Sequence, residues 1–373
     1  MKWFVLGLLK KFVPAILGAN LQLHPRDFKA RFILRKLRWK WPAKPNQKPY
    51  FSDVFFGLLK AYARLAIKLY CRKIVINKPE WLRAGGPLLI AANHPNSFLD
   101  GIILTTLFQN PIYTLARGDA FKQQKWNTLL RALHLLPVYR TSEGVENLSH
   151  NYTTFESCKD VFAQSGIVMI FSEGRCINEW HLRPLKKGTA RLAISAWEND
   201  LEVTVLPLGF NYSPFRSWGK TVHLNFGEPL CKNKITAENT EGKQLLAFNA
   251  QLENQLQQLV YEIDPKDKTT LKKTFFVPAP PFLLLLLALP AAVGWLLHAP
   301  LYYAARVATD VYFDNDHYDS VVVSLLTLAY PLYLLLLFVL AAAFFGWVDA
   351  LLLLVLLPFS AWACLRWKHH MDF

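Results

Sequence analysis

Cysteine is scarce in this chain, and its few positions are far apart. The 373 residues contain five cysteines, and no two of them have the spacing of a metal-ligand pair. They are Cys71, Cys158, Cys176, Cys231 and Cys364. An odd number of distant cysteines argues against a disulfide framework and is typical of a reducing compartment. We therefore expect neither structural disulfides nor a bound metal.

Acidic residues are also few relative to basic ones. The chain has 27 Asp and Glu against 42 Lys and Arg, which gives a formal net charge of +15. A basic chain suits a polyanion, so nucleic acid and an anionic membrane surface are both candidate partners. Long apolar stretches toward the C-terminus favour the lipid bilayer, and we expect no nucleic-acid partner. Internal repeats and low-complexity tracts are missing as well, apart from the leucine runs of the apolar stretches.

A small-residue cleavage site does not follow the apolar stretch at the N-terminus, and Lys10, Lys11 and Pro14 interrupt that stretch. A cleaved signal peptide is therefore not expected. Residues 1–48 combine basic with aromatic side chains, and both kinds favour the membrane–water boundary. We predict an interfacial helical segment here. A solvated basic arm is the alternative.

Residues 50–270 alternate short apolar runs with stretches of helical periodicity, which predicts an α/β domain with a central, mostly parallel sheet flanked by helices. The predicted strands are 73–77, 87–92, 112–116, 136–139, 167–171, 202–210 and 222–226. The predicted helices are 50–72, 97–109, 121–133, 147–164, 186–198 and 236–263. Active sites in such sheets gather at the carboxyl ends of strands.

Residues 275–373 are predominantly apolar, and we predict two to three membrane spans in them. At ~1.5 Å per residue, residues 282–305 can cross a ~30 Å hydrocarbon core. Residues 306–319 are expected to form an acidic polar loop. Residues 320–365 are too long for one crossing, so we divide them near Gly346 to Asp349.

The orientation of these spans follows from the basic residues around them. Four lysines between residues 266 and 273 precede the first span, which favours the cytoplasmic side for that end. Three crossings would put Arg366 and Lys368 on the opposite side, against the same rule. A re-entrant last segment is the alternative.

A polar motif, Asn93-His94-Pro95-Asn96-Ser97-Phe98-Leu99-Asp100, directly follows the predicted strand 87–92. Ser97 and Asp100 have the spacing of a capping box, which would place His94 in the strand-to-helix loop. A carboxylate in the first helical turn can hold one imidazole nitrogen while the other takes a proton from an alcohol. The alternative is that Asp100 only caps the helix and His94 is a structural loop residue.

Charged residues also follow other predicted strands or precede a helix. A guanidinium at a strand end matches phosphate geometry, and paired lysines before a helix indicate an anionic ligand. The alternatives are ordinary salt bridges and a solvated helix face. The residues concerned are Arg117, Arg140, Glu173, Gly174, Arg175, Lys186 and Lys187.

The order and spacing of these motifs over roughly residues 70–230 resemble the glycerol-phosphate and lysophosphatidate acyltransferase family, the PlsC type. The resemblance implies that His94 is the general base and that Asp100 orients it. It implies phosphate and glycerol binding by Arg140, Glu173 and Gly174. Supporting contacts would then come from Arg175, Lys186 and Lys187. Arg117, at the end of a predicted strand, is a weaker candidate for phosphate binding and is not part of the family pattern.

This chain departs from that family pattern in three places. Five residues separate His94 from Asp100 where four are common, Ser172 replaces the usual proline, and Arg175 stands one position earlier than the family's arginine. The intact motif residues argue against an inactive membrane scaffold derived from an acyltransferase, which is the non-enzyme alternative.

The resemblance also implies the substrates. We expect acyl transfer from acyl-CoA or acyl-ACP to lysophosphatidate, without a bound cofactor, with glycerol 3-phosphate or another lysolipid as the alternative acceptor. The expected location is a bacterial inner membrane, with the catalytic domain on its cytoplasmic face.

Overall fold

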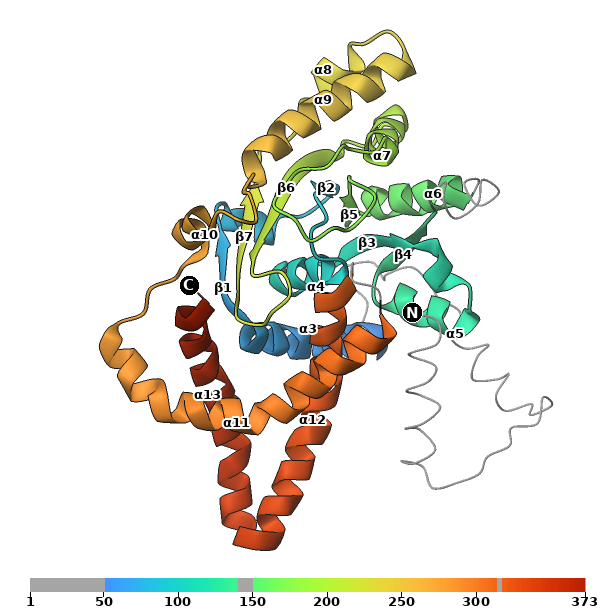
Figure 1. Cartoon of the computed structure of the whole chain (residues 1–373). Helices are drawn as coiled ribbons and strands as arrows, with labels where there is room; N and C mark the ends of the chain where they lie inside the picture. Colours follow the sequence, from blue (N-terminus) through green and yellow to red (C-terminus); the bar gives the residue numbers. More distant parts are fainter. Residues whose placement is uncertain (1–50, 140–149, 314–316, 373) are drawn as a thin grey trace, which may run out of the picture. The chain divides into compact units, whose positions relative to one another are not determined.

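The computed structural model describes residues 51–139, 150–313 and 317–372. The chain divides into two compact units, residues 1–59 and residues 60–373. The second unit contains the whole sheet and the apolar C-terminal helices (Figure 1). The predicted interfacial segment at residues 1–48 lies outside the described residues, and so does Arg140.

Seven strands form one sheet in the order β1-β7-β6-β2-β5-β3-β4. Neighbouring strands are parallel, except that β6 and β7 are antiparallel. The strands are β1 (Cys71–Ile76), β2 (Leu88–Ala92), β3 (Ile112–Arg117), β4 (Leu135–Val138), β5 (Ile167–Phe171), β6 (Thr204–Ser213) and β7 (Lys220–Phe226). The predicted α/β class with a mostly parallel sheet is confirmed.

Helices connect most of the strands, as expected for parallel pairing. They are α3 (Phe51–Tyr70), α4 (Phe98–Leu107), α5 (Gln124–Ala132), α6 (His150–Ala163), α7 (Gly188–Glu198), α8 (Lys232–Thr236), α9 (Glu241–Leu259) and α10 (Lys268–Phe275). The helix predicted at 236–263 is confirmed as α9, but with shorter bounds. α9 begins at Glu241, because the side chain of Thr240 accepts a hydrogen bond from the Lys243 amide, and it ends at Leu259.

The two faces of the sheet bury two separate hydrophobic clusters. Along β2, Leu89 and Ala91 contribute to the cluster that includes residues of α6, α7 and α9. Leu88, Ile90 and Ala92 contribute to the other cluster, which includes residues of α3 and α4. Successive side chains of a strand point to opposite faces, so a strand buried on both faces is apolar throughout. Figure 1 shows α4 and α7 on either side of the sheet.

The register of the central strands aligns their carboxyl ends. Ala92 of β2 pairs with Phe171 of β5 on one side and with Leu208 of β6 on the other. The loops that follow β2 and β5 therefore leave the sheet side by side. Both loops carry polar motifs, beginning at Asn93 and Ser172.

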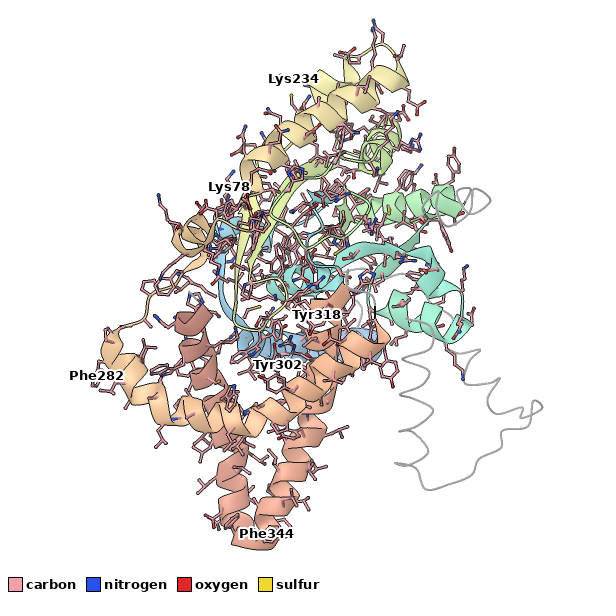
Figure 2. The ribbon with its side chains drawn as sticks, in the orientation of Figure 1. Lys78, Lys234, Phe282, Tyr302, Tyr318 and Phe344 are labelled. Atoms are coloured by element: carbon pink, nitrogen blue, oxygen red, sulfur yellow. The ribbon has the colours of Figure 1, made fainter. Side chains whose placement is uncertain are left out.

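Three apolar helices follow the sheet: α11 (Pro281–Tyr312), α12 (Tyr318–Phe345) and α13 (Trp347–Asp372). Each is long and apolar enough to cross a membrane. Figure 1 shows α12 and α13 as a hairpin, and Figure 2 marks Phe344 near its tip. The predicted division is confirmed, because α12 ends at Phe345 and is followed by Gly346, whose φ of 97° favours glycine. The Phe344 side chain is 78% exposed, as a lipid-facing residue would be.

The polar loop predicted at residues 306–319 is wrong at both ends. α11 continues to Tyr312, so Asp310 is helical, and α12 begins before Asp319. Asp319 is only 1% exposed and pairs with Lys220 of β7 at 2.7 Å. A buried cation neutralises this acid, so it does not require solvent.

Both ends of the hairpin formed by α12 and α13 contact the α/β domain. At its start, Asp319 meets Lys220. At its end, the His369 Nε2 accepts a hydrogen bond of 2.7 Å from the Val277 amide, and the Lys368 ammonium lies 5.4 Å from the centre of the Trp218 ring. The end of α13 therefore lies on the same side of the hairpin as the domain.

α11 packs along the hairpin and returns to the domain. Its Gly294 approaches Ser360 of α13 so closely that a Cβ there would lie 2.2 Å from the Ser360 carbonyl oxygen. Further along, the Arg306 Nε donates to the Tyr318 hydroxyl at 2.9 Å. Pro290 and Pro300 interrupt the hydrogen bonding of this helix, which lets it bend.

Candidate active site

Asn93 joins the end of β2 to β6 through its side chain. Its Nδ2 donates to the Phe210 carbonyl at 3.0 Å, and its Oδ1 accepts from the Phe210 amide at 2.7 Å. Just beyond the end of β2, the Asn93 side-chain amide thus pairs with the backbone of β6 as a peptide group of β2 would. The asparagine is 2% exposed, so its polar atoms need these partners. These two hydrogen bonds fix the backbone position that precedes the next residue, His94.

His94 and Asp100 form the predicted pair. The His94 Nδ1 lies 2.9 Å from the Asp100 Oδ2, and the imidazole stacks on Phe171 with ring centres 3.7 Å apart. The five intervening residues still allow the contact, because Ser97 has a φ of 51° and turns the chain into α4. The His94 side chain is 14% exposed, whereas that of Asp100 is fully buried. The imidazole is therefore held on one side and accessible on another.

The predicted capping box is wrong. Ser97 is the N-cap of α4, but its side chain makes no capping hydrogen bond. Its hydroxyl lies 2.7 Å from the His317 Nδ1 instead, and the Asp100 carboxylate binds His94. Asp100 therefore orients the imidazole and does not close a capping box.

Asp100 receives three hydrogen bonds from the residues that the structure describes. Besides the imidazole, its Oδ2 accepts from the Asn96 amide at 3.0 Å, and its Oδ1 accepts from the Tyr212 hydroxyl at 2.7 Å. Burial, together with the charge of Asp100, raises the pKa of Tyr212 well above its usual value, so the phenol stays protonated and donates. These donors fix the carboxylate in one orientation.

Glu173, in the loop after β5, binds the loop after β2 through a backbone amide. Its Oε2 accepts from the His94 amide at 2.7 Å, and its Oε1 accepts from the Arg183 amide at 2.9 Å. Burial raises the pKa of Glu173 to about 7, although both amide hydrogen bonds oppose that shift. The Glu173 carboxylate therefore holds the backbone at His94, independently of any contact between Glu173 and a substrate.

The Gly174 turn brings Lys186, before α7, against the loop that follows β5. Gly174 has a φ of 69°, and the Lys186 Cγ lies 3.0 Å from the position of a Cβ there. The Lys186 amide donates to the Ser172 carbonyl at 2.7 Å, and Lys187 is the N-cap of α7. Where the resembled family has a proline, the Ser172 hydroxyl lies 3.0 Å from the Thr189 hydroxyl inside α7. The two lysines are exposed and lie beside this turn.

The predicted arginines lie in less defined surroundings. Arg175 is exposed at the turn after β5. Arg117 ends β3 and pairs with Asp119 at 2.8 Å, with both side chains nearly half exposed. The structure therefore brings together His94, Asp100 and Glu173, with Lys186 nearby, and it leaves the roles of the arginines as predictions.

Four residues of this region escaped the sequence reasoning. Asn96 and Tyr212 bind Asp100 directly, Asp319 binds Asn96, and Lys220 pairs with Asp319. For Lys220 and Asp319 the sequence did contain an indication. A lysine at the start of an apolar strand and an acid at the start of an apolar helix are charged residues that need partners when buried.

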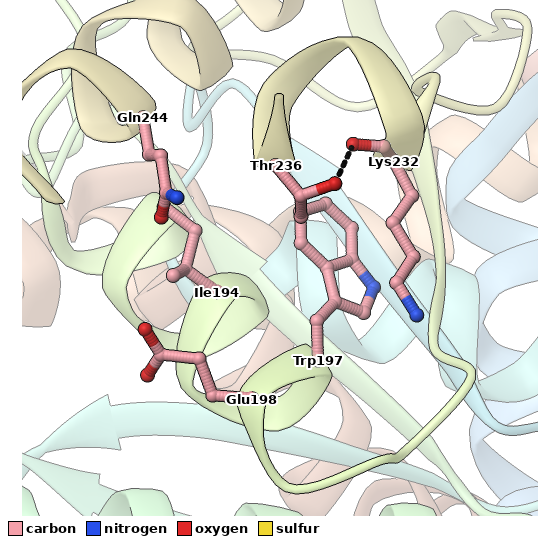
Figure 3. A pocket seen from close by; sticks show the side chains of 6 residues that line it. All are labelled: Ile194, Trp197, Glu198, Lys232, Thr236 and Gln244. Carbon is pink, nitrogen blue, oxygen red and sulfur yellow. Dashed lines mark hydrogen bonds between the residues drawn. The ribbon is translucent and has the colours of Figure 1, made fainter. Parts of the chain in front are cut away.

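A hollow of about 310 Å³ lies elsewhere, between α7 and the segment of α8 and α9 (Figure 3). It is lined by Ile194, Trp197, Glu198, Lys232, Thr236 and Gln244. None of these belongs to a motif, and the hollow is distinct from the His94 site. Among the described residues, no group of three or more His, Cys, Asp and Glu is arranged to hold a metal ion.

The site has the geometry of a histidine–carboxylate pair able to act as a general base at the carboxyl edge of a mostly parallel sheet. Residues 73–211 match the family model described as Acyltransferase. This segment runs from β1 into β6 and includes His94, Asp100 and Glu173, so the match spans the residues of the candidate site.

One solved structure similar to this chain is the crystal structure of the 1-acyl-sn-glycerophosphate (LPA) acyltransferase, PlsC, from Thermotoga maritima. The two chains are 14% identical, with a TM-score of 0.40, and the match covers 62% of this chain and 89% of the other. No curated protein matches the chain.

Proposed function

We propose that this protein transfers a fatty acyl group from an acyl thioester, acyl-CoA or acyl-ACP, to the free hydroxyl of lysophosphatidate. The observation that carries the proposal is the 2.9 Å contact between His94 and Asp100 within the segment that matches the Acyltransferase family model. The exposed Lys186 and Lys187 beside the Gly174 turn support an acceptor that carries phosphate. Lipid-soluble substrates fit a chain that has three long apolar helices.

The residues suggest how the reaction proceeds. Asp100 holds the His94 Nδ1, so the Nε2 takes the proton from the acceptor hydroxyl while that hydroxyl attacks the thioester carbonyl. The buried carboxylate stabilises the imidazolium that forms. When the tetrahedral intermediate collapses, the C–S bond breaks and the leaving thiolate takes the proton from His94. The ester bond is formed and the histidine is neutral again.

The acceptor is tested by direct comparison. We expect the purified full-length protein to transfer a labelled acyl group from acyl-CoA or acyl-ACP to lysophosphatidate with at least about tenfold higher kcat/KM than to glycerol 3-phosphate, a difference of about 1.4 kcal/mol. A lysophospholipid with a choline headgroup tests whether the free phosphate is needed. A preference for glycerol 3-phosphate would identify it as the acceptor in place of lysophosphatidate. Absence of transfer to any acceptor would refute the proposal.

We also propose that the hairpin of α12 and α13 anchors the protein in a bacterial inner membrane, with the α/β domain on the cytoplasmic face. α12 has 28 residues, about 42 Å of helix, which exceeds a hydrocarbon core of about 30 Å. Two crossings, with α11 packed along the hairpin, keep Arg366 and Lys368 on the same side as the lysines at residues 266–273. That arrangement satisfies the positive-inside rule at both places.

This topology predicts the labelling of single cysteines by a membrane-impermeant maleimide in intact cells. Cys231 is exposed on the domain, so it should react only after the cells are permeabilised. In a Cys231→Ser background, Phe344→Cys at the hairpin tip should react without permeabilisation. Protection of Phe344→Cys in intact cells would mean that the hairpin does not reach the far side.

A further inference from the structure

Lys220 and Asp319 form an ion pair that is closed off from solvent. The Lys220 Nζ lies 2.7 Å from the Asp319 Oδ2, and the side chains are 0% and 1% exposed. The lysine also donates to the carbonyls of Pro214 and Phe215, at 2.6 and 2.7 Å. Burial lowers the pKa of Lys220, and the charge of Asp319 opposes that shift. Such a pair is costly to bury, so its contacts are worth following.

The pair links a strand of the sheet to the first turn of α12. Lys220 begins β7, and Asp319 is the second residue of α12. Figure 2 shows the neighbouring Tyr318 at the end of α12 nearest the domain. The family model ends at residue 211, so both charged residues come from outside it.

Asp319 reaches the His94 motif through Asn96. Its Oδ2 accepts from the Asn96 Nδ2 at 2.9 Å, and its Oδ1 accepts from the Tyr70 hydroxyl at 2.6 Å. The backbone amide of the same Asn96 donates to Asp100 at 3.0 Å. A single residue thus connects the α12 carboxylate to the carboxylate that orients His94.

Ser320 holds the same loop from the next position of α12. Its hydroxyl donates to the Asn96 carbonyl at 2.7 Å and accepts from the Leu99 amide at 2.9 Å. It therefore supplies the hydrogen bond to the start of α4 that the side chain of Ser97 does not make. With His317 beside the Ser97 hydroxyl, three residues at the start of α12, His317, Asp319 and Ser320, contact the motif.

We propose that the first turn of α12 positions the His94–Asp100 pair, with Asp319 and Ser320 as positioning residues for acyl transfer. The inference rests on the proposed function. The proposal gives the C-terminal apolar region two roles, positioning the active-site residues and anchoring the protein in the membrane. A misplacement of about 1 Å in a catalytic group can cost on the order of 10² in rate, so a loop held at three points matters for kcat.

Two charge-neutral double variants isolate the role of the acceptor oxygen. Lys220→Met with Asp319→Asn removes both charges but keeps an oxygen that can accept from Asn96. Lys220→Met with Asp319→Leu removes the charges and the oxygen together. Neither double leaves a buried unpaired charge, so both are expected to fold. Asp310→Asn, which neutralises an exposed acid at the end of α11, is the control.

We expect the Leu double to have a kcat about 10- to 100-fold below that of the Asn double, with KM changed less than threefold. Thermal midpoints within a few degrees of each other would show that both doubles are folded. A merely structural ion pair predicts equal kcat values for the two doubles, and that result would overturn the proposal.

Amide hydrogen exchange of residues 94–104 in the full-length protein separates this inference from the proposed function. We expect faster exchange in the Leu double than in the Asn double, whether or not the wild type transfers acyl groups. Unchanged exchange would refute the positioning role by itself. Absence of transfer by the wild type together with faster exchange would refute the proposed function alone.

Discussion

His94→Ala is expected to lower kcat for acyl transfer by roughly 10²- to 10⁴-fold, the usual contribution of a positioned general base. Alanine cannot take the proton from the acceptor hydroxyl, and no other described side chain replaces the hydrogen bond of 2.9 Å with Asp100. KM should change little, because in the proposed mechanism the imidazole contacts the reacting hydroxyl and other residues bind the phosphate. Initial rates with labelled acyl-CoA and the preferred acceptor measure this directly.

The matched control is His181→Ala. His181 is an exposed histidine that pairs with Glu262 at 2.7 Å, and it is not part of the motif. Its loss should leave kcat within about twofold, because an exposed pair contributes little to the fold. If His94→Ala retains more than a tenth of the wild-type kcat, His94 is not the base.

Lys220→Met is expected to lower the free energy of unfolding by about 3–5 kcal/mol, the typical cost of breaking a buried ion pair from one side. The variant leaves the Asp319 carboxylate 1% exposed, with Tyr70 and Asn96 as its remaining partners. Adding Asp319→Leu removes the stranded charge and should recover most of the loss. Thermal or denaturant unfolding of the protein in detergent, followed by tryptophan fluorescence, measures the difference.

Lys232→Met supplies the comparison for an exposed pair. Lys232 lies 2.6 Å from Glu202, whose side chain is 78% exposed, so its loss should cost less than about 1 kcal/mol. Equal losses in the free energy of unfolding for the two lysine variants would show that the buried Lys220–Asp319 pair contributes no more to stability than an exposed pair. A second substitution that fails to restore stability would show that Lys220 acts through its contacts with Pro214 and Phe215.

Much of the fold could be predicted because hydrophobic patterning is a local property. The run at 167–171 is apolar throughout, and it forms the buried β5 with those same bounds. The division of the last apolar stretch was also readable, since Gly346 interrupts a stretch too long for one helix. The errors fell where a side chain decided a boundary, as Thr240 does by beginning α9.

The acidic loop was mispredicted for a different reason. The sequence marks Asp319 as polar, and polar residues beside an apolar span are usually assigned to solvent. Its actual partner, Lys220, is about a hundred positions earlier, and no local pattern connects the two. The same distance hid the role of Ser320, which replaces a cap that the sequence assigned to Ser97.

By itself, the sequence determined the fold class, the long apolar helices and the residues with reactive side chains. Hydrophobic periodicity, the length of apolar segments and side-chain type are all local properties of the sequence. The tertiary structure alone decided what holds those residues. Strand register set His94 beside Glu173, and the return of α12 to the sheet set Asp319 against Asn96. These contacts depend on how distant segments pack, because burial makes each polar group need a partner that only the folded chain can supply.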